Sequence, residues 1–264
     1  MFNKLRSLFS PVAEEPVHPQ AALPPGQRAY AIGDIHGRLD LFEQLLARID
    51  EDDAARGSAQ TTLILLGDLV DRGPDSRGVV ERAMDLMATR KVRVLAGNHE
   101  EMLLGSLENE ETLRHFLRHG GKETLFSYGL TLEEYSRAKL DEICGRANAL
   151  IPADHVAFMR AMENQIVMGD YLFVHAGIRP GVPLDQQMVA DMRWIRREFL
   201  EHGEPHSHLV VHGHTITDEP VVCPNRIGID TGAFASGRLT ALGMEGDDRW
   251  FLTAIIEPEE REAA

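Results

Sequence analysis

The chain has 264 residues and a formal net charge of −15, from 42 acidic and 27 basic side chains. This acidic excess argues against broad binding to nucleic acid, whose phosphate backbone demands basic patches. The two cysteines, Cys144 and Cys223, provide no disulfide framework, and no apolar run approaches the length of a membrane span. We therefore expect a cytoplasmic globular protein with no transmembrane segment and no nucleic-acid partner.

The chain divides into a main part and two ends. Residues 1–27 are predicted to be a disordered N-terminal segment, because prolines cluster between residues 10 and 27. Residues 28–256 are predicted to form a single domain, as their number allows. Residues 257–264 are predicted to be a solvated acidic tail.

Strands and helices are predicted to alternate at the start of this domain. Short aliphatic runs at residues 29–32, 62–66 and 92–96 are typical of buried parallel strands. Between them, apolar side chains recur at helical spacing, first over residues 39–49 and then over residues 80–87. The segment is therefore predicted to be β-α-β-α-β, an arrangement that binds ligands beyond the carboxyl ends of its strands.

A polar motif follows each of the three runs. The motifs are Gly-Asp-Ile-His-Gly at 33–37, Gly-Asp-Leu-Val-Asp-Arg-Gly at 67–73 and Gly-Asn-His-Glu at 97–100. Asp34, Asp68 and Asn98 recur roughly every thirty residues, which is the length of one strand-helix-strand crossover. We expect these three side chains to converge at one edge of the sheet.

The middle of the chain is predicted to be helical. From about residue 101 to residue 165 the strand signals disappear and helical patterns replace them. We interpret this region as a helical cap inserted between strands, covering one rim of the site. Glu100 and Glu101 are expected to begin its first helix, since acidic residues favour a helix N-terminus.

Two histidine motifs follow later strand signals. His175 comes directly after the run 171–174, and His214 lies in the sequence His-Gly-His-Thr after the run 209–211. The sequence leaves open whether His212, in the same motif, is a ligand or a buried residue behind the ligands. The runs 227–232, 238–242 and 250–256 then predict short strands of a second sheet packed on the first.

These residue types indicate a dinuclear metal site. Neutral imidazole and carboxylate oxygen suit borderline divalent ions, and the set contains no cysteine. We expect two divalent ions, with Mn favoured and Fe, Zn, Co or Ni as further candidates.

The motifs, in this order, resemble those of the calcineurin-like metallophosphoesterases, and more narrowly the bacterial and phage form of the serine/threonine phosphoprotein phosphatases. The resemblance covers roughly residues 28 to 242. It implies an α/β fold, a β-sandwich of two mixed sheets flanked by helices with a helical insertion. It also implies a set of metal ligands: Asp34 and His36 for the first ion, Asp68 bridging both ions, and Asn98, His175 and His214 for the second.

The resemblance further assigns catalytic and substrate-binding roles. His99 matches the general acid and Asp71 the carboxylate that orients it. Arg72, Arg196 and Asn98 match residues that bind the substrate phosphate. The implied nucleophile is a metal-bridging hydroxide, because two cations lower the pKa of a shared water. Asp71 is expected to raise the pKa of His99, so that the imidazolium can protonate the leaving group.

Three functions follow from these expectations, and the sequence ranks them. The first is a metal-dependent phosphomonoesterase acting on phosphoserine or phosphothreonine proteins. The resemblance favours it because Asp71 stands where the related symmetrical diadenosine tetraphosphate hydrolases often carry a small residue. The alternative is a symmetrical dinucleoside polyphosphate (diadenosine tetraphosphate) hydrolase. The third is an inactive phosphopeptide-binding scaffold, which the intact ligands and His99 disfavour. The expected partner is therefore a phosphoprotein or a phosphorylated small molecule, and the sequence leaves the oligomeric state open.

Overall fold

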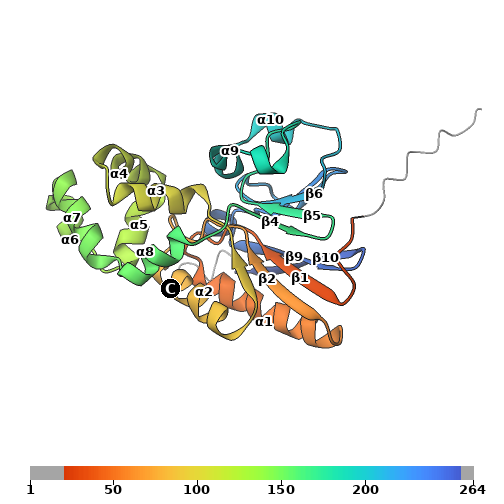
Figure 1. The fold of residues 1–264 in the computed structure, drawn as a ribbon. Coiled ribbons are helices and arrows are strands. Elements are labelled where there is room, and N and C mark those ends of the chain that lie inside the picture. The colour runs from red at the N-terminus through yellow and green to blue at the C-terminus, as the bar shows by residue number, and fades with distance from the viewer. Residues whose placement is uncertain (1–20, 257–264) are drawn as a thin grey trace, which may run out of the picture.

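Two five-stranded sheets lie face to face in the computed structural model, which describes residues 21–256 (Figure 1). The first sheet has the strand order β10-β9-β1-β2-β3. Its strands are β1 (Gln27–Ile32), β2 (Gln60–Leu65), β3 (Val92–Val94), β9 (Arg238–Glu245) and β10 (Asp248–Ile255). β1, β2 and β3 run parallel, as their apolar character predicts, and β9 and β10 join antiparallel. The mixed, two-sheet α/β fold expected from the resemblance is therefore confirmed.

The second sheet has the order β4-β5-β6-β8-β7 and is also mixed. Its strands are β4 (Gln165–Met168), β5 (Tyr171–Val174), β6 (Leu209–His212), β7 (Val221–Val222) and β8 (Arg226–Gly228). β5 and β6 are the strands predicted before the two histidine motifs.

The strands β9 and β10 correct one prediction. The runs 238–242 and 250–256 were expected in the second sheet, but they form a hairpin on the first, with Ala31 of β1 paired to Leu242 of β9. β9 is buried on both faces, so its side chains supply two cores at once. Leu239 faces the helical side and Met244 the other sheet. A run that is apolar at every position does not show which neighbour it pairs with, and this is why its sheet was misassigned.

Helices cover the outer faces of both sheets. α1 (Leu39–Ala55) and α2 (Ser76–Thr89) pack beneath the first sheet, and α9 (Val189–Trp194) and α10 (Arg197–Leu200) lie above the second (Figure 1). Phe42 and Leu46 of α1 are buried, as the helical spacing predicts, whereas Met87 of α2 is 47% exposed. A separate apolar cluster between the two sheets, which includes Ile64, joins the layers into one sandwich.

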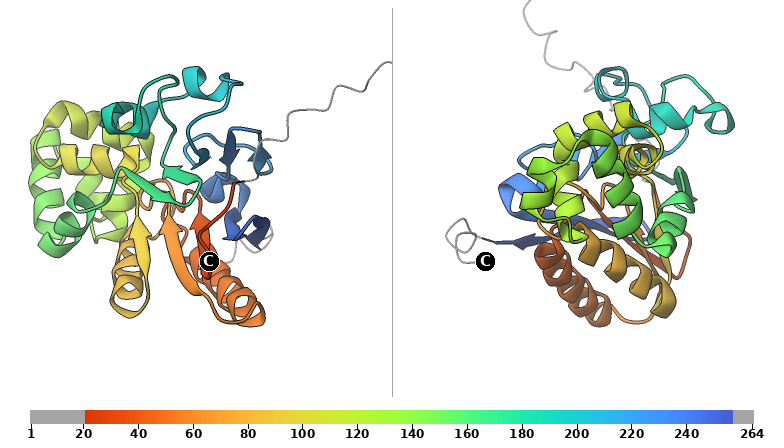
Figure 2. Two further views of the ribbon diagram at one scale, coloured as in Figure 1. Left: turned by 45° about the vertical axis from the view of Figure 1, so that its right-hand side comes forward. Right: turned by 90° about the vertical axis from the view of Figure 1, so that its left-hand side faces the viewer.

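A group of helices projects from one end of the sandwich, and Figure 2 shows it in front of the sheets in the right-hand view. These helices are α3 (Asn98–Ser106), α4 (Glu110–Phe116), the π-helix η1 (Leu117–Gly121), α5 (Lys122–Ser127), α6 (Leu132–Arg137), α7 (Leu140–Leu150) and α8 (Ala153–Arg160). They occupy the region where the sequence predicts a cap. The remaining short helices are η2 (Leu184–Gln186) and α11 (Ala233–Ser236).

The chain before β1 is packed from residue 21 onward. Leu23 is buried, its N–H donates to the Gly246 carbonyl, and Tyr171 donates to the Ala21 carbonyl. The predicted disordered segment 1–27 therefore differs from the structure over its last residues, because Leu23 has an apolar site to fill. Residues 1–20 and the predicted tail 257–264 lie outside the described residues. Within those described, no helix is long and apolar enough to cross a membrane.

Candidate metal centre

Strained backbone marks the edge of the sandwich where the motif loops meet. Among residues 21–256, five non-glycine residues have a positive φ, and all five were predicted as site residues. They are His36 (φ 48°), Asp68 (φ 49°), Asp71 (φ 73°), Arg72 (φ 69°) and His214 (φ 64°). Each such conformation costs about 1–3 kcal/mol and persists only where the surroundings enforce it. The placement of these side chains therefore requires a strained backbone, which the rest of the fold stabilises.

Asp68 lies at the centre of the predicted ligands. One carboxylate oxygen, Oδ2, is 3.6 Å from His36 Nε2 and 3.9 Å from His99 Nε2. The other, Oδ1, is 3.4 Å from His175 Nε2. Two groups of potential ligand atoms thus share Asp68, namely His36, Asp68 and His99, and Asp68, His175 and His214. The two groups contain four of the six predicted ligands, His36, Asp68, His175 and His214, together with His99, which was predicted as the acid.

Hydrogen bonds fix the orientation of two of the histidines. His36 Nδ1 donates to the Val70 carbonyl at 2.7 Å, and His175 Nδ1 donates to the Leu66 carbonyl at 2.8 Å. Each bond places the ring proton on Nδ1 and turns Nε2 toward Asp68. His175 Nε2 is also 3.0 Å from Asn98 Oδ1, which brings the predicted amide ligand into the second group.

The donor set fits divalent cations. Two buried ligand atoms, Asp34 Oδ1 and His214 Nε2, find no hydrogen-bond partner among the described residues. A Cβ on Gly97 would collide with the Asp68 carboxylate, and a Cβ on Gly213 with that of Asp34. The backbone therefore comes close to both carboxylates where only glycine fits. Unpaired buried oxygen and imidazole nitrogen are the ligands that borderline divalent ions take.

Burial drives the ionisable groups of this cluster toward their neutral forms. It lowers the pKa of His175 to about 4 and, with the neighbouring His175, that of His214 to about 2. It raises the pKa of Asp68 to about 6, and that of Asp34 well above its usual range with help from nearby carboxylates. The histidines are therefore unprotonated at neutral pH, as ligands must be, and a bound cation offsets the cost of ionised carboxylates.

The predicted acid pair is present, with a protonation state opposite to the expected one. His99 Nδ1 is 2.6 Å from Asp71 Oδ2, and both side chains are buried. Arg72 Nη2 donates to His99 Nε2 at 3.0 Å, so the ring proton lies on Nδ1 and donates to Asp71. Burial lowers the pKa of His99 to about 4, which outweighs the attraction of the Asp68 carboxylate. Asp71 is the partner of His99 as predicted, but the pKa of His99 is lowered rather than raised, because the sequence pattern carries no measure of burial.

A small polar cavity opens onto the ligands. Its volume is about 250 Å³, and it is lined by Asp68, Arg72, Asn98, Arg196, His214, Thr215 and Ile216. Arg72, Arg196 and Asn98, which were predicted to bind the substrate phosphate, all line this cavity. The guanidinium of Arg72 also lies 4.7 Å above the ring of Phe234. Arg196 is exposed, and its Nη1 lies 3.5 Å from the Thr215 hydroxyl oxygen.

Glu100 holds the central loop, a role that its sequence position did not reveal. Its buried carboxylate accepts hydrogen bonds from the backbone N–H groups of Asp68, Leu69 and Val70, and from that of Gly97. It therefore ties the loop that carries Asp68 to the start of α3. Glu100 does lie in the first turn of a helix, as predicted, but its carboxylate serves the neighbouring loop as well.

Asp230 was not predicted as a site residue. It is buried after β8, accepts from the Gly232 N–H, and raises the pKa of Asp34 through the repulsion of the two carboxylates. Only its apolar flanks, Ile229 and the preceding strand, signalled burial in the sequence. His212, whose role was open, packs edge to face on Phe199 with centroids 5.1 Å apart, on the side of the second sheet away from Asp68.

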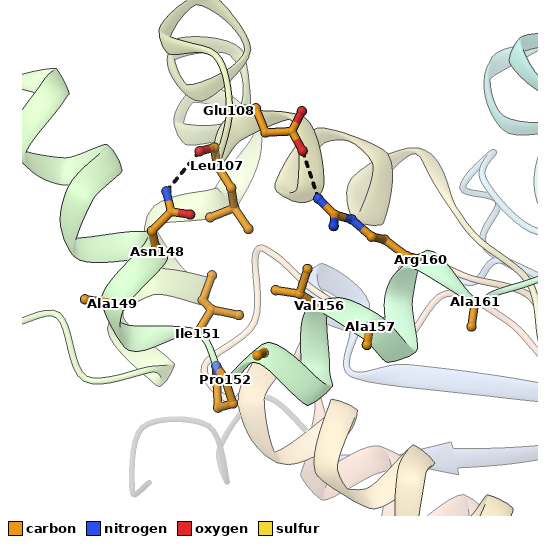
Figure 3. Close-up of a pocket in the computed structure, with 11 residues that line it drawn as sticks. Leu107, Glu108, Asn148, Ala149, Ile151, Pro152, Val156, Ala157, Arg160 and Ala161 are labelled. Atoms are coloured by element: carbon orange, nitrogen blue, oxygen red, sulfur yellow. Dashed lines mark hydrogen bonds and ion pairs between the residues drawn. The ribbon is translucent and has the colours of Figure 1, made fainter.

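A second recess lies in the helical cap and contains none of these residues (Figure 3). It measures about 910 Å³ and lies between α7, α8 and the turn after α3. Figure 3 shows that its two charged side chains, Glu108 and Arg160, pair with each other at 2.8 Å, and that Asn148 bonds the Leu107 carbonyl. With its polar groups paired among themselves, this recess has no chemistry comparable to the cavity at Asp68.

Comparisons with known proteins point to one family of phosphoesterases. The family model of the calcineurin-like phosphoesterases matches residues 28–234. The bis(5'-nucleosyl)-tetraphosphatase PrpE [asymmetrical] of Anoxybacillus flavithermus is 30% identical over 236 residues, which span 80% of this chain and 88% of that protein. The protein of the same name from Bacillus cereus is 28% identical over 232 residues, with the same coverage.

Solved structures share the fold. A candidate diadenosine tetraphosphatase superposes with a TM-score of 0.61 at 23% identity, covering 90% of this chain and 100% of that one. A cold-active protein tyrosine phosphatase superposes with a TM-score of 0.54 at 20% identity, covering 88% and 81%. At these identities the likeness concerns the architecture alone.

Proposed function

Because the chain belongs to the calcineurin-like phosphoesterases and is a hydrolase, we propose that it hydrolyses dinucleoside polyphosphates, with diadenosine tetraphosphate as the representative substrate. The observation that carries this proposal is the likeness to bis(5'-nucleosyl)-tetraphosphatases, which extends over 88% of their length. The likeness therefore favours the dinucleoside polyphosphate hydrolase, which the sequence analysis ranked second, over the phosphoprotein phosphatase, which it ranked first.

The polar cavity suits a phosphate chain. Arg72 and Arg196 both line it, and guanidinium groups bind phosphate oxygens in a bidentate manner. The protein as a whole carries a charge of −15, so this local pair of cations offsets the general repulsion of an anionic substrate. A polyphosphate has several anionic groups in a row and can engage both arginines.

Two divalent cations, held by Asp34, His36, Asp68, Asn98, His175 and His214, would polarise the phosphoryl oxygens and activate a water molecule. We propose Mn²⁺ as the ion that serves best, because Mg²⁺ prefers oxygen ligands and three of these residues are histidines. The role of Arg72 is to neutralise charge on the phosphoryl oxygens. When its guanidinium turns to the phosphate, it leaves the unprotonated His99 Nε2, which can then take up a proton from solvent and pass it to the leaving group.

A phosphoprotein phosphatase is the second candidate, and the pair of His99 and Asp71 favours it. A nucleotide leaves as a stable phosphate anion and needs little protonation, whereas the alkoxide of serine or threonine does need a proton. A buried histidine held 2.6 Å from a carboxylate is therefore of greater use for an ester than for an anhydride.

One experiment separates the two candidates. Mn²⁺-reconstituted enzyme is assayed side by side on diadenosine tetraphosphate, a phosphothreonine peptide and an aryl phosphate. We expect kcat/KM to be highest for the dinucleotide, and higher with Mn²⁺ than with Mg²⁺. Identification of the products as two ADP, or as ATP and AMP, then distinguishes symmetrical from asymmetrical cleavage. Faster turnover of the peptide would support the phosphoprotein phosphatase instead. If none of the three substrates is hydrolysed, the inactive phosphopeptide-binding scaffold becomes the best account.

A further inference from the structure

An exposed tryptophan stands beside the cavity, and neither the proposed chemistry nor the fold uses its outer face. Trp194 ends α9 and is 37% exposed. Its ring centroid lies 6.5 Å from that of His214, with the planes at 79°. Since His214 lines the cavity and Arg196 follows two residues later, the indole sits at the rim of the phosphate site.

Exposed apolar side chains occur on the same cavity and on the same helix as this indole. Ile216, which also lines the cavity, is 48% exposed, and Val189 on the same helix is exposed too. His115 of α4 approaches from the helical cap, with centroids 6.5 Å apart and the planes at 45°. That separation is at the upper end of the roughly 4.5–7 Å range for aromatic pairs. His115 is exposed and also lies against His119, with ring centroids 4.1 Å apart, so Trp194 is not its main aromatic neighbour.

From this arrangement we propose that Trp194 is the platform on which a nucleobase of the substrate stacks. Stacking on an aromatic face is tolerant of base identity, because every base has a π-face. A phosphate chain bound by Arg72 and Arg196 puts its attached nucleoside at the rim, where the indole lies. This inference rests on the proposed function and adds the subsite that recognises the nucleoside.

Phe234 is an aromatic side chain near the cavity that already packs against His36 and Arg72. Its ring contacts His36 edge to face at 5.4 Å and carries the Arg72 guanidinium at 4.7 Å. It is only half exposed, so it holds Arg72 in place and leaves the base to Trp194.

The test compares Trp194→Ala, Trp194→Phe and a control, Phe251→Ala. Phe251 on β10 is similarly exposed, at 40%, and belongs to the first sheet rather than to the rim. For diadenosine tetraphosphate we expect Trp194→Ala to lower kcat/KM about 5- to 150-fold, mainly through KM, the equivalent of about 1–3 kcal/mol. Trp194→Phe retains most of the activity, and Phe251→Ala all of it. Equal losses for Trp194→Ala and Phe251→Ala would overturn the proposal.

A binding measurement keeps this inference separate from the proposed function. AMP, titrated into the wild-type protein, is expected to quench tryptophan fluorescence, whereas inorganic phosphate is not. The quenching is lost in Trp194→Phe, while the inhibition constant for phosphate is unchanged. If diadenosine tetraphosphate is hydrolysed but AMP causes no quenching through Trp194, the stacking subsite is wrong and the proposed function stands. If the phosphothreonine peptide is the better substrate and Trp194→Ala lowers kcat/KM only for the peptide, the proposed function and the stacking subsite are both wrong. Trp194 would then contact a protein substrate.

Discussion

The loops that carry Asp68 and the rim that carries Trp194 are held in different ways. Asp68 is buried and has a positive φ, and its loop donates three backbone hydrogen bonds to the Glu100 carboxylate, which accepts a fourth from the Gly97 N–H. Trp194 and Arg196 are exposed and make few contacts. The candidate ligands therefore lie in an interior that many contacts hold in place, whereas the proposed base-stacking subsite lies on an exposed rim, where sequence can vary more freely.

The largest effect is expected at the centre of the interior. Asp68→Asn removes the charge that faces both ligand groups, so we expect at least one of two metal ions to be lost. Activity should fall roughly 10⁴-fold, since cation polarisation contributes several kcal/mol and each 1.36 kcal/mol is tenfold. Metal analysis of the purified variant, alongside kinetics, checks this. Two tightly bound ions in the variant would contradict the bridging role.

His99 is expected to show a loss that depends on the leaving group. His99→Asn should lower turnover of an alkyl phosphate roughly 10²–10⁴-fold, the range for a general acid, and that of an aryl phosphate less. Asp71→Asn should give a smaller loss with the same bias. Both variants should retain the metal content of the wild type. Equal losses on both substrates, together with a lost metal, would make His99 a ligand, as its place in one group of potential ligand atoms allows.

Substitution of Glu100 tests whether the Asp68 loop depends on the hydrogen bonds that it donates to this carboxylate. Glu100→Gln leaves one oxygen for the four N–H groups, so we expect metal affinity or activity to fall about 10- to 100-fold. The matched control is Glu108→Gln, on the outer side of the helical cap, where the side chain pairs with Arg160. Titration of Mn²⁺ into each chelated variant measures the difference. Identical Mn²⁺ affinities would show that the Asp68 loop needs no support from Glu100.

The smallest effect on activity is expected far from both regions. Asp52 accepts hydrogen bonds from Tyr30, Arg56 and Trp250. Although burial alone would raise it, the pKa of Asp52 is lowered by these donors. Its stabilising effect is therefore present above the unfolded pKa and is lost as pH falls through the lower folded one. Asp52→Asn should cost about 1 kcal/mol of unfolding free energy at pH 7 and no activity. Urea titrations should show this difference beginning to shrink as pH falls below about 4 and vanishing only below the folded pKa.

The sequence predicted what local pattern encodes. The apolar runs fixed the strands, and the polar residues that follow them, from Asp34 to His214, meet at one edge as expected. The pairing of β9 with β1 was missed, because an evenly apolar strand carries no record of its neighbour. Asp230 was missed for a related reason, since a single carboxylate after a strand has no motif, and only the folded chain brings it beside Asp34.

The pairing of β1 with β9 also sets the order in which the molecule can be completed. Ala31, near the start of the chain, finds its antiparallel partner Leu242 close to the other end. Until the ribosome has released that region, one edge of an apolar strand is unpaired and open to association with other chains. Asp34 directly follows β1, and Asp230 precedes β9. The carboxylates of Asp34 and Asp230 therefore come together only once segments far apart in the sequence have folded onto each other, and we expect metal to bind after that step.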